Sequence, residues 1–220
     1  MRRLVVLRPE PGASETLRRA RERSLDATAI PLFEIEPIAW DAPEASGFDA
    51  LLLTSANAVG FGGERLRDYR GLPVHAVGET TAQAARDAGF DIATTGDSGV
   101  ERLLASIEPN QRLLHLSGEE AKDPGDARQQ IERIAVYRSR PIDSPDLSTL
   151  KGAVALVHSP RAASRLAALV EHREAIVIAA ISEAAAEAAR EGWERVEVAE
   201  APRDEALLAL AARVCNSSAP

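Results

Sequence analysis

The segment VALVHSPRAASRLAALVEHREAIVIAAISEAAAEAAR, residues 154–190, decides the fold of this chain. It reads as an apolar strand, a serine, an amphipathic helix, a second apolar strand and an alanine-rich helix. A shift of 104 positions places it without a gap on residues 50–86, ALLLTSANAVGFGGERLRDYRGLPVHAVGETTAQAAR, with nine identities in 37 positions. Both copies keep the same order of elements, so we interpret them as a duplicated half of an α/β protein.

The same alternation extends outward in both directions. Leu4–Leu7 is a short apolar strand, and the helix after it is expected to begin at Ser14 as its N-cap. Further strands are predicted at Ala50–Thr54, Val74–Val77, Asp91–Thr94, Arg112–Leu116, Ala153–His158, Ala175–Ala180 and Arg195–Ala199, and helices at Thr80–Ala88, Val100–Ile107, Ala162–Val170 and Glu183–Glu191. Gly89 and Gly192 stand where helix ends need a left-handed residue. Strands alternating with helices predict parallel sheets.

Two segments break the alternation and suggest how the chain is divided. Residues 33–40 and 131–140 alternate apolar and polar side chains and no helix follows them directly. We interpret 35–40 and 131–141 as a two-stranded antiparallel connector. The predicted fold is therefore two similar open parallel-sheet domains, flavodoxin-like or Rossmann-like. A discontinuous domain A comprises 1–34 plus 142–220, and domain B comprises 41–130.

Composition excludes several classes of function. Asp and Glu total 34 against 26 Lys and Arg, a net charge of −8, which argues against a nucleic-acid partner. The single cysteine, Cys215, excludes an internal disulfide, and the four histidines lack metal-binding spacing. Neither a dinucleotide fingerprint nor a P-loop occurs, so no cofactor or metal is predicted. No apolar run approaches 18 residues, and we expect no membrane partner and a monomer in the cytoplasm.

Ligands of open parallel sheets bind beyond the carboxyl ends of the strands. The turns at those positions are rich in hydroxyls, glycine and arginine, which suit an anionic ligand held in a cleft between the two domains. Tyr137, one of two tyrosines, lies on the connector between Val136 and Arg138. Helix capping alone also explains each serine. The candidates are Arg8, Ser55, Thr81, Ser117, Tyr137, Arg138, Ser159, Arg161 and Ser182.

The ensemble of these segments resembles the uroporphyrinogen-III synthase family. The resemblance rests on Arg8-Pro9 after the first strand, PLFEIEP at 31–37, LLLTSANAV at 51–59, AVGETTAQAARDAGF at 76–90, VYRSRP at 136–141, and residues 154–169 and 181–192. It covers nearly the whole length in the family's order. It implies cofactor-free closure of hydroxymethylbilane with loss of water and inversion of the last pyrrole ring, and a transient contact with hydroxymethylbilane synthase.

Carried over residue by residue, the resemblance implies that Ser55, Thr81, Tyr137 and Ser159 contact the linear tetrapyrrole. Arg8 and Ser117 would be further contacts, and Tyr137 the best-placed proton donor for the leaving hydroxyl. The substrate carries eight carboxylates, so a protein of charge −8 must attract it locally, through Arg8, Arg138 and Arg161.

The sequence departs from the family pattern at two places. Ala184 and Ala185 stand where the family often has a threonine, and Asn57 stands where it often has arginine. A second reading therefore stays open, in which a non-catalytic or regulatory homologue binds a tetrapyrrole or another small anionic ligand. A binding protein for an unrelated small anion is a third reading, which rests on fold analogy alone.

Overall fold

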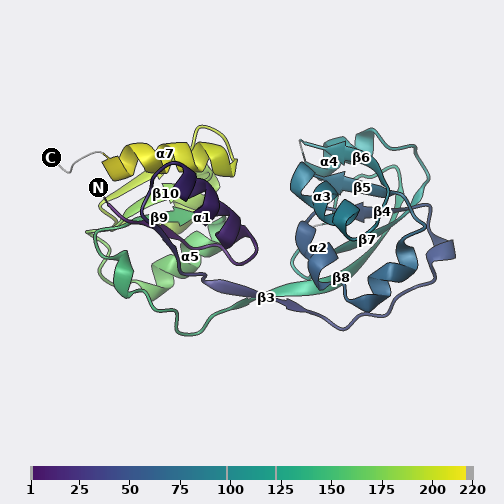
Figure 1. Cartoon of the computed structure of the whole chain (residues 1–220), viewed down its shortest axis with the longest axis horizontal. Helices are drawn as coiled ribbons and strands as arrows, with labels where there is room; N and C mark the ends of the chain where they lie inside the picture. The colour runs from purple at the N-terminus through teal and green to yellow at the C-terminus, as the bar shows by residue number, and fades with distance from the viewer. Residues whose placement is uncertain (1, 98, 122, 217–220) are drawn as a thin grey trace. The chain divides into compact units, whose positions relative to one another are not determined.

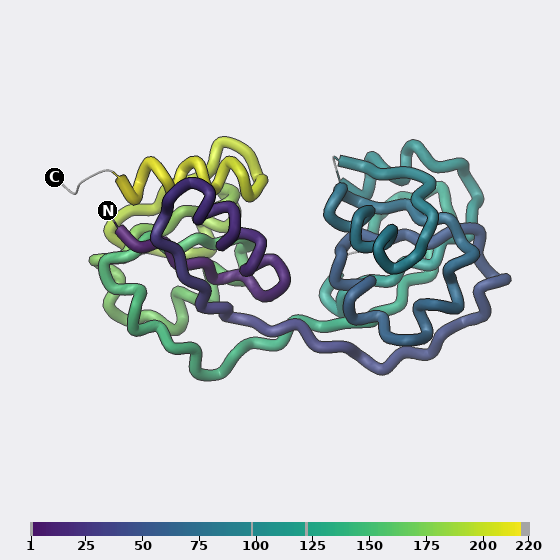
Figure 2. Tube along the Cα trace, viewed as in Figure 1, coloured from purple at the N-terminus to yellow at the C-terminus, as the bar shows by residue number. Residues whose placement is uncertain are grey.

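The computed structural model describes residues 2–97, 99–121 and 123–216. Its chain divides into two compact units: Met1–Glu34 with Pro141–Pro220, here the terminal unit, and Ile35–Arg140, here the central unit. Both ends of the described chain belong to the terminal unit (Figure 2). There the backbone N–H of Arg2 donates to the carbonyl of Cys215 at 3.0 Å. None of the helices in the described ranges is long and apolar enough to cross a membrane.

The terminal unit is built on a five-stranded sheet in the order β11-β10-β9-β1-β2, in which every neighbouring pair is parallel. Its elements are β1 (Leu4–Val6), α1 (Gly12–Glu22), β2 (Ala27–Ala29), η3 (Ser148–Leu150), β9 (Val154–Val157), α5 (Pro160–Leu169), β10 (Val177–Ala180), α6 (Glu183–Ala189), β11 (Arg195–Val198) and α7 (Asp204–Asn216). Helices cover both faces of this sheet (Figure 1).

Successive strand residues point to opposite faces, which explains the unbroken apolar runs. Val5 and Leu7 pack with residues of α5 and α6, whereas Leu4 packs with residues of α7 on the other face. All three are fully buried. Each such side chain contributes about 1.5–3 kcal/mol by leaving water, so a strand buried on both faces needs no polar positions.

The central unit carries a six-stranded sheet in the order β3-β8-β7-β4-β5-β6. Its elements are β3 (Phe33–Pro37), η1 (Ala45–Gly47), β4 (Ala50–Leu53), α2 (Ala56–Phe61), η2 (Glu64–Tyr69), β5 (Val74–Val77), α3 (Glu79–Asp87), β6 (Ile92–Gly96), α4 (Val100–Ala105), β7 (Arg112–Gly118) and β8 (Gln130–Pro141). The pairs from β8 to β6 are parallel. α2 and α3 cover one face and α4 covers the other.

The edge strand β3 and its neighbour β8 contain the two segments expected as connectors. Ile38 N–H donates to the carbonyl of Val136, and Ile142 N–H donates to the carbonyl of Leu32, both at 3.0 Å. As the residue number rises from 32 to 38 on one segment, the number of its partner falls from 142 to 136 on the other. This order is typical of strands that run in opposite directions.

The internal repeat corresponds to a real structural equivalence between the two sheets. Adding 104 to β4, residues 50–53, gives 154–157, the bounds of β9, and adding 104 to the first residue of α2 or α3 gives the first residue of α5 or α6. The order β6-β5-β4-β7-β8 then matches β11-β10-β9-β1-β2 strand for strand. The prediction of two similar parallel-sheet domains is confirmed. The strands β1 and β2 of the terminal unit are equivalent to β7 and β8 of the central unit.

The start of the first helix was predicted wrongly. α1 begins at Gly12 with Pro11 at the N-cap, and Ser14 lies inside the first turn. The Ser14 N–H and hydroxyl both donate to the Glu10 carboxylate, at 3.0 and 2.9 Å. Proline is well suited to a helix start because its fixed φ fits the helix and its missing N–H costs no bond there. Gly89 and Gly192 do adopt positive φ, 86° and 97°, as expected after the helices.

Candidate functional site

The strand orders fix where each unit can bind a ligand. In the terminal unit the chain proceeds one way from β1 to β2 and the opposite way from β9 to β11, so the order reverses between β1 and β9. In the central unit the reversal lies between β4 and β7. Ligands of open α/β sheets bind at the carboxyl ends of the strands beside such a switch point.

The strand register brings four predicted residues of the central unit to this edge. Leu53 of β4 pairs with Leu116 of β7. Continued by two residues, the register sets Ser55 level with Gly118, and Gly118 pairs with Tyr137 of β8. Thr81 lies in the first turn of α3, which directly follows β5, and Ser117 precedes Gly118 on β7.

The Tyr137 ring packs directly against Gly118, where any larger residue would clash with it. A Cβ on Gly118 would lie 2.9 Å from Cε2 and Cζ of the Tyr137 ring, closer than real Cβ contacts. The Phe61 ring stands 6.4 Å away, centroid to centroid, at a tilt of 41°. Tyr137 is half-buried, and its hydroxyl enters no hydrogen bond within the described ranges. The phenol is therefore fixed in place with its donor unused.

The hydroxyls at this edge differ in how available they are. Ser55 caps α2 by accepting from the N–H of Asn57 at 3.2 Å, and its own hydrogen stays free to donate. Thr81 is almost fully buried. Ser117 is 1% exposed, donates to the carbonyl of Gly118 at 3.2 Å and accepts from Nη1 of Arg133 at 3.5 Å. Ser117 is thus already bonded within the protein.

Arg133, which was not predicted as a site residue, forms hydrogen bonds at the same edge. Its Nη1 donates to the carbonyl of Gly118 at 3.3 Å, and its Nε pairs with Asp123 at 3.1 Å. Beneath the edge, the Nε2 of His115 lies 3.1 Å from the hydroxyl oxygen of Thr54. Burial, with the charge of Arg133 adding to it, lowers the pKa of His115 to about 4, so this histidine is neutral at pH 7.

In the terminal unit Arg8, Ser159 and Ser182 lie on the loops after β1, β9 and β10, and Arg161 lies in the first turn of α5. Ser159 caps α5 by accepting from the N–H of Ala162 at 3.1 Å, and Ser182 caps α6 through Ala185 at 3.3 Å. The guanidinium of Arg161 lies over the Phe33 ring, 4.3 Å from its centroid. Capping and a cation–π contact therefore account for part of what these three side chains do.

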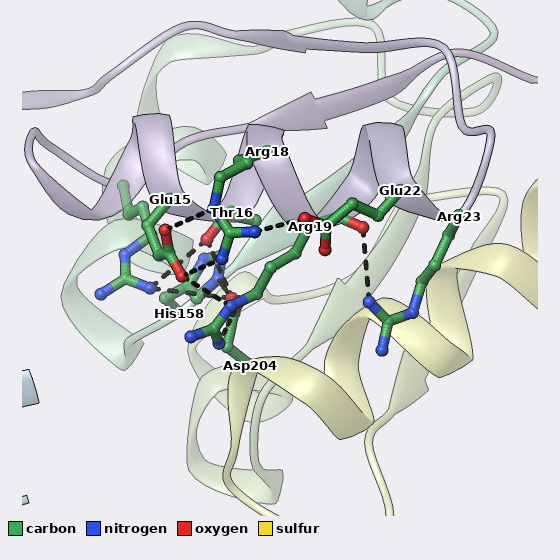
Figure 3. Close-up of polar contacts among 9 residues, drawn as sticks. Glu15, Thr16, Arg18, Arg19, Glu22, Arg23, His158 and Asp204 are labelled. Atoms are coloured by element: carbon green, nitrogen blue, oxygen red, sulfur yellow. Dashed lines mark hydrogen bonds and ion pairs between the residues drawn. The ribbon is translucent and has the colours of Figure 1, made fainter. Parts of the chain in front are cut away.

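Beside the β1/β9 switch point, the predicted residue Arg8 belongs to a polar cluster whose other members were not predicted as site residues. Oδ1 of Asp204, the first residue of α7, accepts hydrogen bonds from Nε2 of His158 and from the hydroxyl of Thr16, both at 2.9 Å (Figure 3). Its Oδ2 lies 3.4 Å from Nη1 of Arg19. Nη1 of Arg8 donates to the Thr16 oxygen at 3.4 Å and stands 3.7 Å from Oδ1 of Asp204.

The charge state of this cluster follows from its burial. The side chains of His158 and Asp204 are 8% and 13% exposed. Burial lowers the pKa of His158 and outweighs the hydrogen bond to Asp204. Burial pushes the pKa of Asp204 upward, but the bonds from His158 and Thr16 outweigh it, and the pKa lies below its ordinary value. A neutral His158 therefore donates from Nε2 to an ionised Asp204.

Arg138 is committed to another partner. Its Nε and Nη2 donate to one carboxylate oxygen of Glu36, at 3.2 and 3.1 Å, and Arg140 pairs with the other oxygen at 2.6 Å. The side chains of both arginines are 50% exposed. As for metals, no group of three or more His, Cys, Asp or Glu suited to holding an ion occurs in the part of the chain that the structure describes.

Two repeated α/β units, each with hydroxyl side chains and an arginine at the edge beside its switch point, define a two-unit open-sheet protein. The chain belongs to the uroporphyrinogen-III synthase family: the family model described as "Uroporphyrinogen-III synthase HemD" matches residues 14–209.

Individual relatives agree with this assignment. A uroporphyrinogen-III synthase of Chlorobaculum parvum is 29% identical over 119 residues, which are 50% of this chain and 48% of that protein, so the match spans about half of the relative. The uroporphyrinogen-III synthetase of Helicobacter pylori has a similar fold, with a TM-score of 0.70 at 20% identity over 97% of this chain and 100% of that one. A mutant uroporphyrinogen III synthase of Thermus thermophilus gives a TM-score of 0.51 at 18% identity, over 94% and 97%.

Proposed function

We propose that this chain is a uroporphyrinogen-III synthase, a lyase that closes hydroxymethylbilane to uroporphyrinogen III with loss of water and without a cofactor. The observation that carries the proposal is the family match over residues 14–209, with the polar residues at the carboxyl edges of both sheets as its chemical support. The same match favours the enzyme over a non-catalytic homologue.

The reaction asks for positioning more than for strong acid–base chemistry. Hydroxymethylbilane loses its hydroxyl readily and closes by itself to the uninverted isomer. An enzyme must hold the chain so that the substituted carbon of the terminal ring attacks instead. One proton is needed to release the hydroxyl as water. The hydroxyl of Tyr137 has no hydrogen-bond partner among the described residues and is our candidate donor.

Substrate carboxylates require hydrogen-bond donors, and the capping serines still have one each. Ser55, Ser159 and Ser182 accept from backbone N–H groups, so their hydroxyl hydrogens are available to a carboxylate oxygen. Capping and ligand binding are therefore compatible in one side chain. Thr81 is the fourth hydroxyl that we assign to the substrate.

Arginines have to supply the attraction against a net charge of −8. Arg8 is the better candidate, because one ion pair to Glu36 already occupies Arg138. We retain Arg138, Arg161 and Ser117 as weaker substrate contacts. Ser117 ranks last because its hydroxyl is buried and bonded at both ends.

An isomer assay tests the proposal. Freshly made hydroxymethylbilane is incubated with the protein, the products are oxidised, and the type III and type I uroporphyrins are separated. We expect a large excess of type III that scales with protein concentration and disappears on heat denaturation. The spontaneous ratio at every protein concentration would favour the non-catalytic homologue. A monomeric state, a cytoplasmic location and a contact with hydroxymethylbilane synthase stay predictions.

A further inference from the structure

Arg8 is a partly buried arginine that leaves most of its donors unused among the described residues. Its side chain is 35% exposed, and burial lowers the pKa of its guanidinium from the ordinary value while Asp204 opposes that change. A guanidinium has five N–H donors. Within the described part of the chain, one hydrogen bond to Thr16 is found for Arg8. A partly desolvated cation with spare donors is suited to a carboxylate.

The position of Arg8 depends on a glycine. A Cβ on Gly12 would lie 2.4 Å from Nε, 2.6 Å from Cζ and 2.7 Å from Nη2 of Arg8. The guanidinium therefore rests directly on the first residue of α1, and it does so because Gly12 has no side chain. Gly12 is not at positive φ, so an alanine there would not strain the backbone, and the three atoms nearest to its Cβ would all belong to Arg8.

Asp204 steadies Arg8 without saturating it. Its Oδ1 already accepts from His158 and Thr16, and its Oδ2 faces Arg19. The Arg8 contact to Oδ1 is accordingly 3.7 Å, longer than a hydrogen bond. Glu15 forms its ion pair with Arg19, at 2.8 Å, and Arg8 donates to Thr16. The network thus orients one nitrogen of Arg8 and leaves the others open.

We propose that Gly12, Thr16 and Asp204 are positioning residues that hold the Arg8 guanidinium at the β1/β9 switch point for one carboxylate of the tetrapyrrole. The inference rests on the proposed function for the identity of the ligand. His158 acts one step further away, because its neutral ring donates to Asp204 and fixes the carboxylate. None of these three residues needs to touch the substrate.

Three substitutions test the positioning role in different ways. Gly12→Ala displaces Arg8 sterically, Thr16→Val removes its hydrogen-bond partner with little change of shape, and Asp204→Asn removes the charge. Each is made in the wild-type chain and in an Arg8→Gln background. Affinity for uroporphyrinogen III is measured by anaerobic titration calorimetry, and KM and kcat are measured with hydroxymethylbilane. Glu22→Gln on the same helix, where Glu22 pairs with Arg18, is the matched control.

We expect each substitution to weaken binding and raise KM by about tenfold with kcat little changed, the effect typical of losing one hydrogen bond to a charged group. In the Arg8→Gln background the same substitutions should change affinity by less than about twofold, because the group they position is gone. Gly12→Ala should keep the melting temperature of the wild type, and Glu22→Gln its affinity.

An equal loss of affinity in both backgrounds, or wild-type affinity in Gly12→Ala and Thr16→Val, would overturn the positioning role. A wild-type chain that does not bind uroporphyrinogen III would overturn it as well. The calorimetric result is independent of turnover. A chain that produced the spontaneous isomer ratio yet lost affinity as described would therefore support the Arg8 network while it refuted the proposed enzyme.

Discussion

Replacing the buried His115 should remove a defined pH dependence of stability. The pKa of His115 is about 4 in the folded protein against 6.5 for a free histidine. Between these values the unfolded chain takes up a proton and the folded chain does not, so stability falls as pH falls from 6.5 toward 4. The difference of 2.5 units corresponds to about 3 kcal/mol in total. From pH 7 to pH 5 the loss attributable to His115 is about 2 kcal/mol.

Urea unfolding at the two pH values measures this loss. Trp40 lies in the central unit with His115, and a Trp193→Phe background removes the signal of the terminal unit. Other groups also titrate, so the informative quantity is how the gap between the parent and His115→Leu changes with pH. We expect the parent to lose about 2 kcal/mol more than His115→Leu between pH 7 and pH 5. Equal losses in the parent and His115→Leu would refute a neutral buried His115.

Three further predictions test the proposed site. Tyr137→Phe should lower kcat by about 100-fold or more if the phenol donates the proton that releases the hydroxyl. The control Tyr69→Phe loses a hydrogen bond to the carbonyl of Pro43 and should lower stability without changing kcat. Turnover rates and melting curves measure the two effects. Gly118→Ala should lower kcat with a small change in melting temperature, because its Cβ would displace the Tyr137 ring; an unchanged kcat would contradict the fixed phenol. Arg138→Ala should raise KM less than Arg8→Ala does, since Glu36 already neutralises Arg138; the reverse order in steady-state kinetics would favour the connector arginine.

Much of the fold could be predicted because its signals are local. The strands of a buried parallel sheet are continuous apolar runs, and the hydroxyl residues after them, such as Ser55 and Ser159, stand at fixed positions in the repeat. The matching offset of 104 residues held for β4 and β9 to the residue. One error fell at an element end, at Ser14, where the Glu10 carboxylate and Pro11 start the helix earlier than the serine suggests. The strand β2 and the helix α7 were not predicted.

The network around Arg8 could not be predicted from the sequence. Thr16, His158 and Asp204 come from α1, the loop after β9 and the start of α7, and 188 positions separate Thr16 from Asp204. Each has an ordinary local explanation: a helix residue, a strand end, an acidic residue in the first turn of a helix. Only the sheet order β9-β1 makes them neighbours. The ion pair of Arg138 with Glu36 is another contact between distant residues, at a separation of 102 positions.

Amide hydrogen exchange with bound uroporphyrinogen III tests the location of the site most directly. The account predicts slower exchange at the carboxyl edges of both sheets, in peptides that contain Arg8, Ser55, Thr81 and Ser159, and little change elsewhere. The central unit also has a groove of about 810 Å³ lined by Pro37–Asp41 and Phe61–Arg65. Protection confined to that groove, with none at the strand ends, would contradict the site described for this family member.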